Sequence, residues 1–89
     1  MTTRRALADM PAAQQAGILC NDRQFRAFAA HRNGFPGGQF TPGAAAEWLR
    51  QQCGITSRRH LNHSQTALAR FQEIRTEFDA WTGKIATPR

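Results

Sequence analysis

The sequence predicts an all-α fold, a small helical bundle of about four helices, on the strength of three observations. A long apolar stripe repeats at helical spacing near the C-terminus, a second segment carries helix-start and helix-stop signals, and no stretch alternates apolar and polar residues as strands do. The 89 residues are enough for one domain. We expect residues 17–86 to form a single helical domain, residues 1–16 a flexible N-terminal arm or marginal helix, and residues 87–89 a tail.

The strongest helix signal lies between His63 and Ile85. Apolar residues follow one another here at spacings of four, three, four, three and four positions: Ala67, Phe71, Ile74, Phe78, Trp81 and Ile85. This spacing places them on one face of an α-helix. A helix of about 20 residues is about 30 Å long, so it can form the wall against which shorter helices pack.

Two shorter helices are predicted before it. The first should start after Asn21-Asp22, because either side-chain oxygen can cap a helix, and run to about Arg32. Asn33-Gly34 should end it, since glycine accepts the left-handed conformation that closes many helices.

The segment NGFPGGQF predicts a loop with two aromatic residues, Phe35 and Phe40. We expect at least one of them to pack into the core, with an exposed stacking platform as the alternative. The glycines do not have the spacing of a phosphate-binding loop, GxxxxGK[ST], and no lysine follows them in the next helix.

The second helix is predicted to open at Thr41-Pro42, a capping residue followed by a proline at the first helical position. It should close at Cys53, because Gly54 follows. Trp48 is expected to be its main anchor against the long helix.

The segment AAEWLRQQCGITSRRHLNH resembles a helix-turn-helix, with a short helix between the second helix and the long C-terminal one. Four residues fit the turn of that motif: Cys53, Gly54, Ile55 and Ser57. Two features depart from it, because Arg50 stands where a small residue is usual and His60 stands where an apolar one is. The competing interpretation is a turn that only delivers the chain into the last helix.

The net charge of +6, from 12 basic and 6 acidic residues, predicts an anionic partner, of which nucleic acid is the commonest. The excess lies outside the long helix, where the charges cancel. The predicted nucleic-acid contacts are Arg50, Arg58, Arg59 and His63, supported by Arg23 and Arg26, with DNA favoured over RNA. An arginine-rich composition also arises from GC-rich coding sequence, so this alternative stays open.

The sequence contains no recognisable metal-binding or catalytic motif. Cys20, Cys53, His60 and His63 match no familiar zinc spacing, so no metal and no cofactor are predicted. Pairs such as Cys53 with His60 or His31, or the carboxylates Glu73 and Glu77, lack the motif that positions a nucleophile and a base, so the protein is expected not to be an enzyme. No leader or membrane span is recognisable, which predicts a cytoplasmic protein.

Three segments, ILCNDRQFRAF, AAEWLRQQCGITSRRHL and ALARFQEIRTEFDAW, together resemble small proteins encoded by temperate phages and prophages over about residues 18–82. The resemblance rests on a Cys-Gly-Ile-x-Ser-Arg pattern followed by a helix that ends FDAW. It implies an accessory role in the host cell, beside recombination or replication genes or as an inhibitor of a host defence complex. It implies no catalytic residues.

A protein-interaction module is the alternative function. The long apolar stripe would also suit a helix that pairs across a two-fold axis in a homodimer, or one that covers a host or phage protein. In that case three aromatic residues are expected at the interface: Phe71, Phe78 and Trp81.

Overall fold

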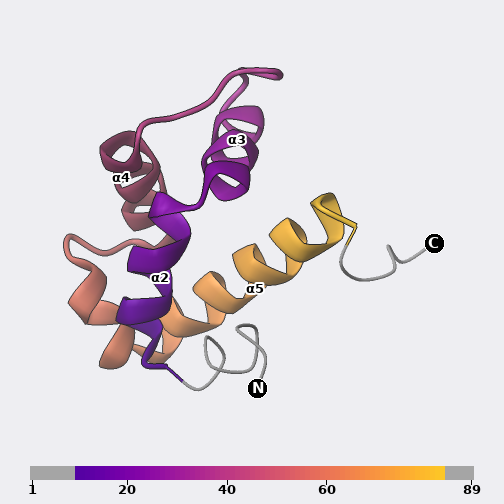
Figure 1. Cartoon of the computed structure of the whole chain (residues 1–89). Coiled ribbons are helices and arrows are strands. Elements are labelled where there is room, and N and C mark those ends of the chain that lie inside the picture. The colour runs from indigo at the N-terminus through magenta and orange to yellow at the C-terminus, as the bar shows by residue number, and fades with distance from the viewer. Residues whose placement is uncertain (1–9, 84–89) are drawn as a thin grey trace.

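The computed structural model describes residues 10–83, and every regular element in that range is a helix. In chain order these are α2 (Ala12–Asn21), α3 (Arg23–Arg32), α4 (Pro42–Cys53), the 3-10 helix η1 (Arg58–Asn62) and α5 (Gln65–Trp81). The predicted all-α fold is therefore confirmed. Figure 1 shows α3 and α4 side by side above α5, with α2 in front and the α3–α4 loop at the top.

The helix boundaries follow local capping chemistry. Asp22, Thr41 and Ser64 each accept a hydrogen bond from a backbone N–H two or three residues further on, at 2.8, 3.1 and 3.2 Å. These bonds satisfy amides that a first helical turn leaves without partners. The predicted start of α3 and both predicted ends of α4 are confirmed, and α5 fills 17 residues of the long predicted helix.

An aromatic cluster forms the centre of the core. The ring centroid of Phe78 in α5 lies 5.2 Å from Phe25 and 5.4 Å from Phe28, both in α3. Trp48 in α4 meets the same two rings at 6.2 and 6.0 Å, nearly edge to face. Trp48 is thus buried, as expected of an anchor, but its ring contacts are with α3 and not with α5. Phe25 and Phe28 lie between Trp48 and Phe78 of α5.

The apolar stripe of α5 is buried along most of its length. Ala67, Phe71, Ile74 and Phe78 are each at most 2% exposed, whereas Trp81 keeps 45% of its surface in solvent. Ile85, the last predicted member, lies outside the described residues.

Helix α2 is not among the helices that the sequence predicts, the first of which was expected after Asn21-Asp22. Residues 12–16 were expected in a flexible arm or marginal helix, yet Ala12, Gln15 and Ala16 are buried in the packed α2. Small alanine side chains let this helix approach its neighbours closely, so a large apolar stripe is unnecessary. Residues 1–9 and the predicted tail, 87–89, lie outside the described part of the chain.

The two phenylalanines of the α3–α4 loop differ in exposure. Phe40 is partly buried and packs against the core, as expected for at least one of them. Phe35 is 58% exposed. Among residues 10–83, no helix is both long enough and apolar enough to cross a membrane.

Replacing Trp48 by Ala should lower the free energy of unfolding by about 3–5 kcal/mol, because it removes a buried ring from the aromatic cluster. The matched variant Trp81→Ala should cost less, about 1–3 kcal/mol, since 45% of that residue is already exposed and less apolar surface is lost. Urea unfolding monitored by circular dichroism measures both. Equal costs would contradict the assignment of Trp48 as the buried anchor.

Candidate nucleic-acid interface

The turn between α4 and η1 is closed by a Schellman motif. Gly54 adopts the left-handed conformation, with φ 69° and ψ 34°. The Ile55 N–H donates to the Arg50 carbonyl at 3.0 Å and the Gly54 N–H to the Gln51 carbonyl at 3.2 Å. These two bonds satisfy carbonyls that the last turn of α4 would otherwise leave free. The backbone of Arg50 is therefore part of this hydrogen-bonded turn.

The element after the turn is too short to act as a recognition helix. η1 is a 3-10 helix of five residues, about 10 Å long at about 2.0 Å per residue. Leu61, its fourth residue, is buried, while His60 at its centre is exposed. The helix-turn-helix resemblance therefore extends to the turn and not to a second α-helix that could lie along a groove.

Two contacts hold η1 along α2. The Asn62 side-chain oxygen accepts a hydrogen bond from the Ala13 N–H at 3.1 Å, which caps α2 from 49 positions away because Pro11 offers no side-chain cap. At the other end, the Arg58 guanidinium lies over Gly17, where an added Cβ would stand 3.5 Å from Nη1. Since Arg58 meets Gly17 and Asn62 meets Ala13, η1 runs antiparallel to α2.

Arg50 and Arg58 come from different elements but both lie near the buried Cys20 thiol. Burial raises the pKa of Cys20, while the charge of Arg58, its hydrogen bond to the thiol and the charge of Arg50 oppose that rise. Burial also raises the pKa of Cys53, against the charge of Arg70. Both thiols are free and buried.

We call Arg50, Arg58, Arg59 and His63 the basic turn. Arg58, Arg59 and His63 are exposed and Arg50 is partly exposed. In residues 10–83, no carboxylate forms an ion pair with any of these four residues. His60 adds a fifth basic group that was not among the predicted contacts. It stands where the motif has an inward apolar residue, but the apolar Leu61 beside it takes the buried position.

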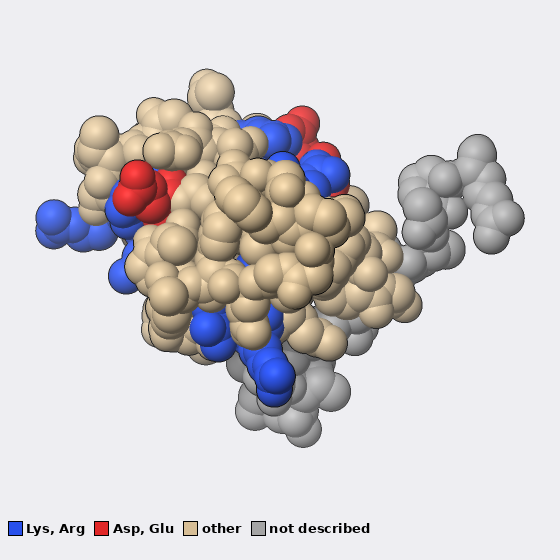
Figure 2. Space-filling model, turned by 90° about the horizontal axis from the view of Figure 1, so that it is seen from above, with Lys and Arg blue, Asp and Glu red and all other residues tan. Residues whose placement is uncertain are grey.

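The other two predicted contacts, Arg23 and Arg26, form a separate group on α3. The Arg26 Nη1 donates to the Phe40 carbonyl at 3.4 Å, and the Gln39 side chain donates to the Arg23 carbonyl at 3.2 Å. Both arginines thus lie against the loop that precedes α4, whereas the basic turn follows α4. On the face in Figure 2, the Lys and Arg side chains likewise lie in separate groups rather than one continuous surface.

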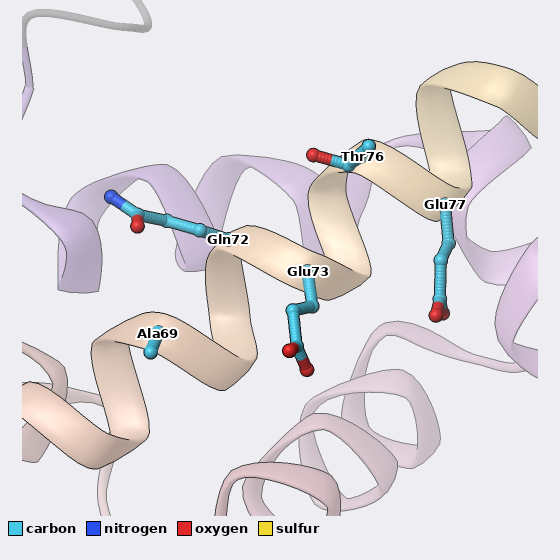
Figure 3. A pocket seen from close by; sticks show the side chains of 5 residues that line it. All are labelled: Ala69, Gln72, Glu73, Thr76 and Glu77. Carbon is cyan, nitrogen blue, oxygen red and sulfur yellow. The ribbon is translucent and has the colours of Figure 1, made fainter.

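Two of the three carboxylates of α5 form ion pairs with arginines of the bundle. Glu77 pairs with Arg32, and Glu73 pairs with Arg70 at 3.2 Å. Figure 3 shows both glutamates extending to the same side of α5, at a shallow depression that Ala69, Gln72 and Thr76 also line. No group of three or more metal-ligating side chains is placed to hold an ion in the described part of the chain.

The residues expected at a protein interface are mostly inside the molecule. Phe71 and Phe78 are each 1% exposed within the chain's own core. Trp81 alone of the three offers substantial surface, with its ring 5.6 Å from Phe28 and 6.0 Å from His31.

Comparison with known proteins yields no relative: no family model, no curated protein and no solved structure matches the chain.

Asn62→Ala should release the N-terminal turn of α2, because it removes the one side-chain cap of that turn found among residues 10–83. The free energy of unfolding should fall by about 1 kcal/mol, and the Ala13 amide should exchange its hydrogen faster in NMR-detected exchange. Asn21→Ala is the matched control, since Asn21 bonds only to the Gly17 carbonyl within α2. Unchanged exchange at Ala13 in Asn62→Ala would show that Asn62 does not hold η1 to α2.

Stability should also fall as pH rises above the ordinary thiol pKa of 9.0. In that range the unfolded chain loses its thiol protons while the folded chain, with both pKa values raised, retains them, so deprotonation favours unfolding. The chain has no tyrosine and a single lysine, so few other groups titrate there. Urea unfolding under reducing conditions at a series of pH values should show this slope, and Cys20→Ala/Cys53→Ala should flatten it.

Proposed function

We propose that this is a small, basic, non-enzymatic protein that contacts nucleic acid through the basic turn. One observation carries the proposal: three arginines without a carboxylate partner in the described range gather at one turn. Arg32 and Arg70 form ion pairs with glutamates, whereas Arg50, Arg58 and Arg59 gather at one turn without a carboxylate partner among residues 10–83. Arg23, Arg26 and Arg75 also lack a carboxylate partner in this range, but they are divided between α3 and α5, so the basic turn holds the largest group of such arginines.

The chemistry of such a surface is phosphate neutralisation. Guanidinium groups bind phosphate oxygens through two parallel hydrogen bonds and release condensed counterions, so affinity depends strongly on salt. Because the Arg58 guanidinium is held over Gly17, this side chain loses less rotational freedom on binding. Because η1 is short and packed on α2, contact with the sugar-phosphate backbone of the nucleic acid is favoured over readout of base pairs in a groove.

The resemblance to small phage and prophage proteins supports an accessory role for this binding in the host cell. A protein-interaction module is the second candidate. The observation that favours it is the exposed Trp81, held against Phe28 and His31 at the end of α5.

The experiment is a fluorescence-anisotropy titration of labelled duplex DNA, single-stranded DNA and RNA at about 50 and 200 mM salt, where phosphate-dependent affinities differ most visibly. Arg58→Gln/Arg59→Gln should weaken binding and make the slope of log affinity against log salt shallower by about 1.4 on single strands and 1.8 on duplexes, since each lost contact contributes about 0.7 or 0.9.

The matched control is Arg32→Gln/Arg70→Gln, which removes the same two charges from arginines already paired with glutamates. Exposed pairs of this kind contribute only about 0–1 kcal/mol to stability, so this variant should fold and keep most of the affinity. If wild-type protein binds none of the three polymers at low salt, the proposed function is wrong, and Trp81 becomes the surface to test for a protein partner.

A further inference from the structure

The α3–α4 loop holds an exposed aromatic ring on a rigid turn. The Gly38 N–H donates to the Phe35 carbonyl at 2.9 Å, and Gly37, with φ 83°, follows Pro36, as in a type II turn. The Phe35 N–H donates to the Ala30 carbonyl at 2.9 Å, which fastens the turn to the end of α3. Phe35 is therefore exposed in a defined backbone geometry and not on a loose segment.

A shallow pocket with a mainly apolar lining lies beside this ring. Its walls come from Ala30, Phe35, Gly38, Gln39 and Phe40. The rings of Phe35 and Phe40 lie 6.4 Å apart and are tilted by 57°. A Cβ on Gly38 would stand 3.2 Å from the Phe35 carbonyl oxygen, so a residue without a side chain lets the turn close here.

Positive charge adjoins the pocket from α3. Arg26 reaches the Phe40 carbonyl with its guanidinium, and Gln39 bonds to the backbone of Arg23, whose side chain is exposed. Neither arginine pairs with a carboxylate in the described range. One acidic residue, Glu47, shares a second depression with Phe40 on the α4 side and bonds to Gln51.

An exposed ring beside unpaired arginines is the combination that binds unpaired bases. Proteins that hold single strands stack bases on aromatic side chains and follow the backbone with positive charge. A base inside a duplex offers no free face to such a ring. The loop and the basic turn lie at opposite ends of α4, about 18 Å apart at 1.5 Å per residue for its 12 residues, a span that one flexible strand can follow.

We infer that the polymer is single-stranded nucleic acid and that one of its bases stacks on Phe35 while its phosphates contact Arg23 and the basic turn. This inference rests on the proposed function. It names the class of ligand, which the basic turn alone does not determine.

The test compares Phe35→Leu with wild type on a labelled oligothymidine of about 15 nucleotides, within the footprint of known single-strand binders, and on a duplex of the same length. Phe35→Leu should weaken single-strand binding at least fivefold, the equivalent of about 1 kcal/mol for one stacked base, and leave duplex binding unchanged. Phe35→Trp should keep the wild-type affinity for the single strand, because the ring and not its apolar surface carries the interaction. Trp81→Leu, which removes the other exposed aromatic ring, should bind like wild type.

The two hypotheses fail separately. If wild type binds both polymers equally and Phe35→Leu changes neither affinity, the stacking inference is overturned while the basic turn remains supported. Wild-type affinity for the single strand in Phe35→Leu, or loss of binding in Trp81→Leu alone, would also overturn it. If wild type binds no polymer at low salt, the proposed function itself fails.

Discussion

The structure depends on one aromatic cluster. Phe25 and Phe28 of α3 receive Trp48 from α4 on one side and Phe78 from α5 on another, with several rings nearly edge to face. Such pairs add to the free energy that burial of the rings already provides. A chain of 89 residues buries a limited share of its surface, so a few large side chains carry much of the stability. The angles between α3, α4 and α5 follow from how these rings fit together.

A second, more polar contact joins α2 to η1 and determines where the basic turn lies. η1 has a single buried apolar residue, Leu61, and would not persist alone at five residues. It is held by the Asn62 bond to Ala13 and by the approach of Arg58 to Gly17. The same contacts that stabilise η1 therefore restrict the arginines beside it, which links the packing of the bundle to the surface it presents.

The sequence determined the elements whose ends depend on neighbouring residues. Asp22 and Thr41 cap helices through bonds to amides two or three positions away, and Gly54 closes α4 through its own left-handed conformation, so these boundaries were predictable. The stripe of α5 was predictable because its period repeats within one segment. The closeness of the three arginines of the basic turn was also predictable, since Arg58 and Arg59 follow the turn that ends the helix of Arg50.

Only the tertiary structure decided which of these side chains are exposed to solvent and which are paired or buried. Arg32 is paired and Arg58 is not because Glu77 lies 45 positions from Arg32 in sequence yet beside it in space. Trp81 and Phe35 are exposed, and Ala12 and Ala16 buried, for reasons that no local pattern carries: burial depends on which surfaces meet. The cap that Asn62 provides for α2 is equally non-local. The sequence thus specified helices and charges, and long-range contacts determined which charges and rings face solvent.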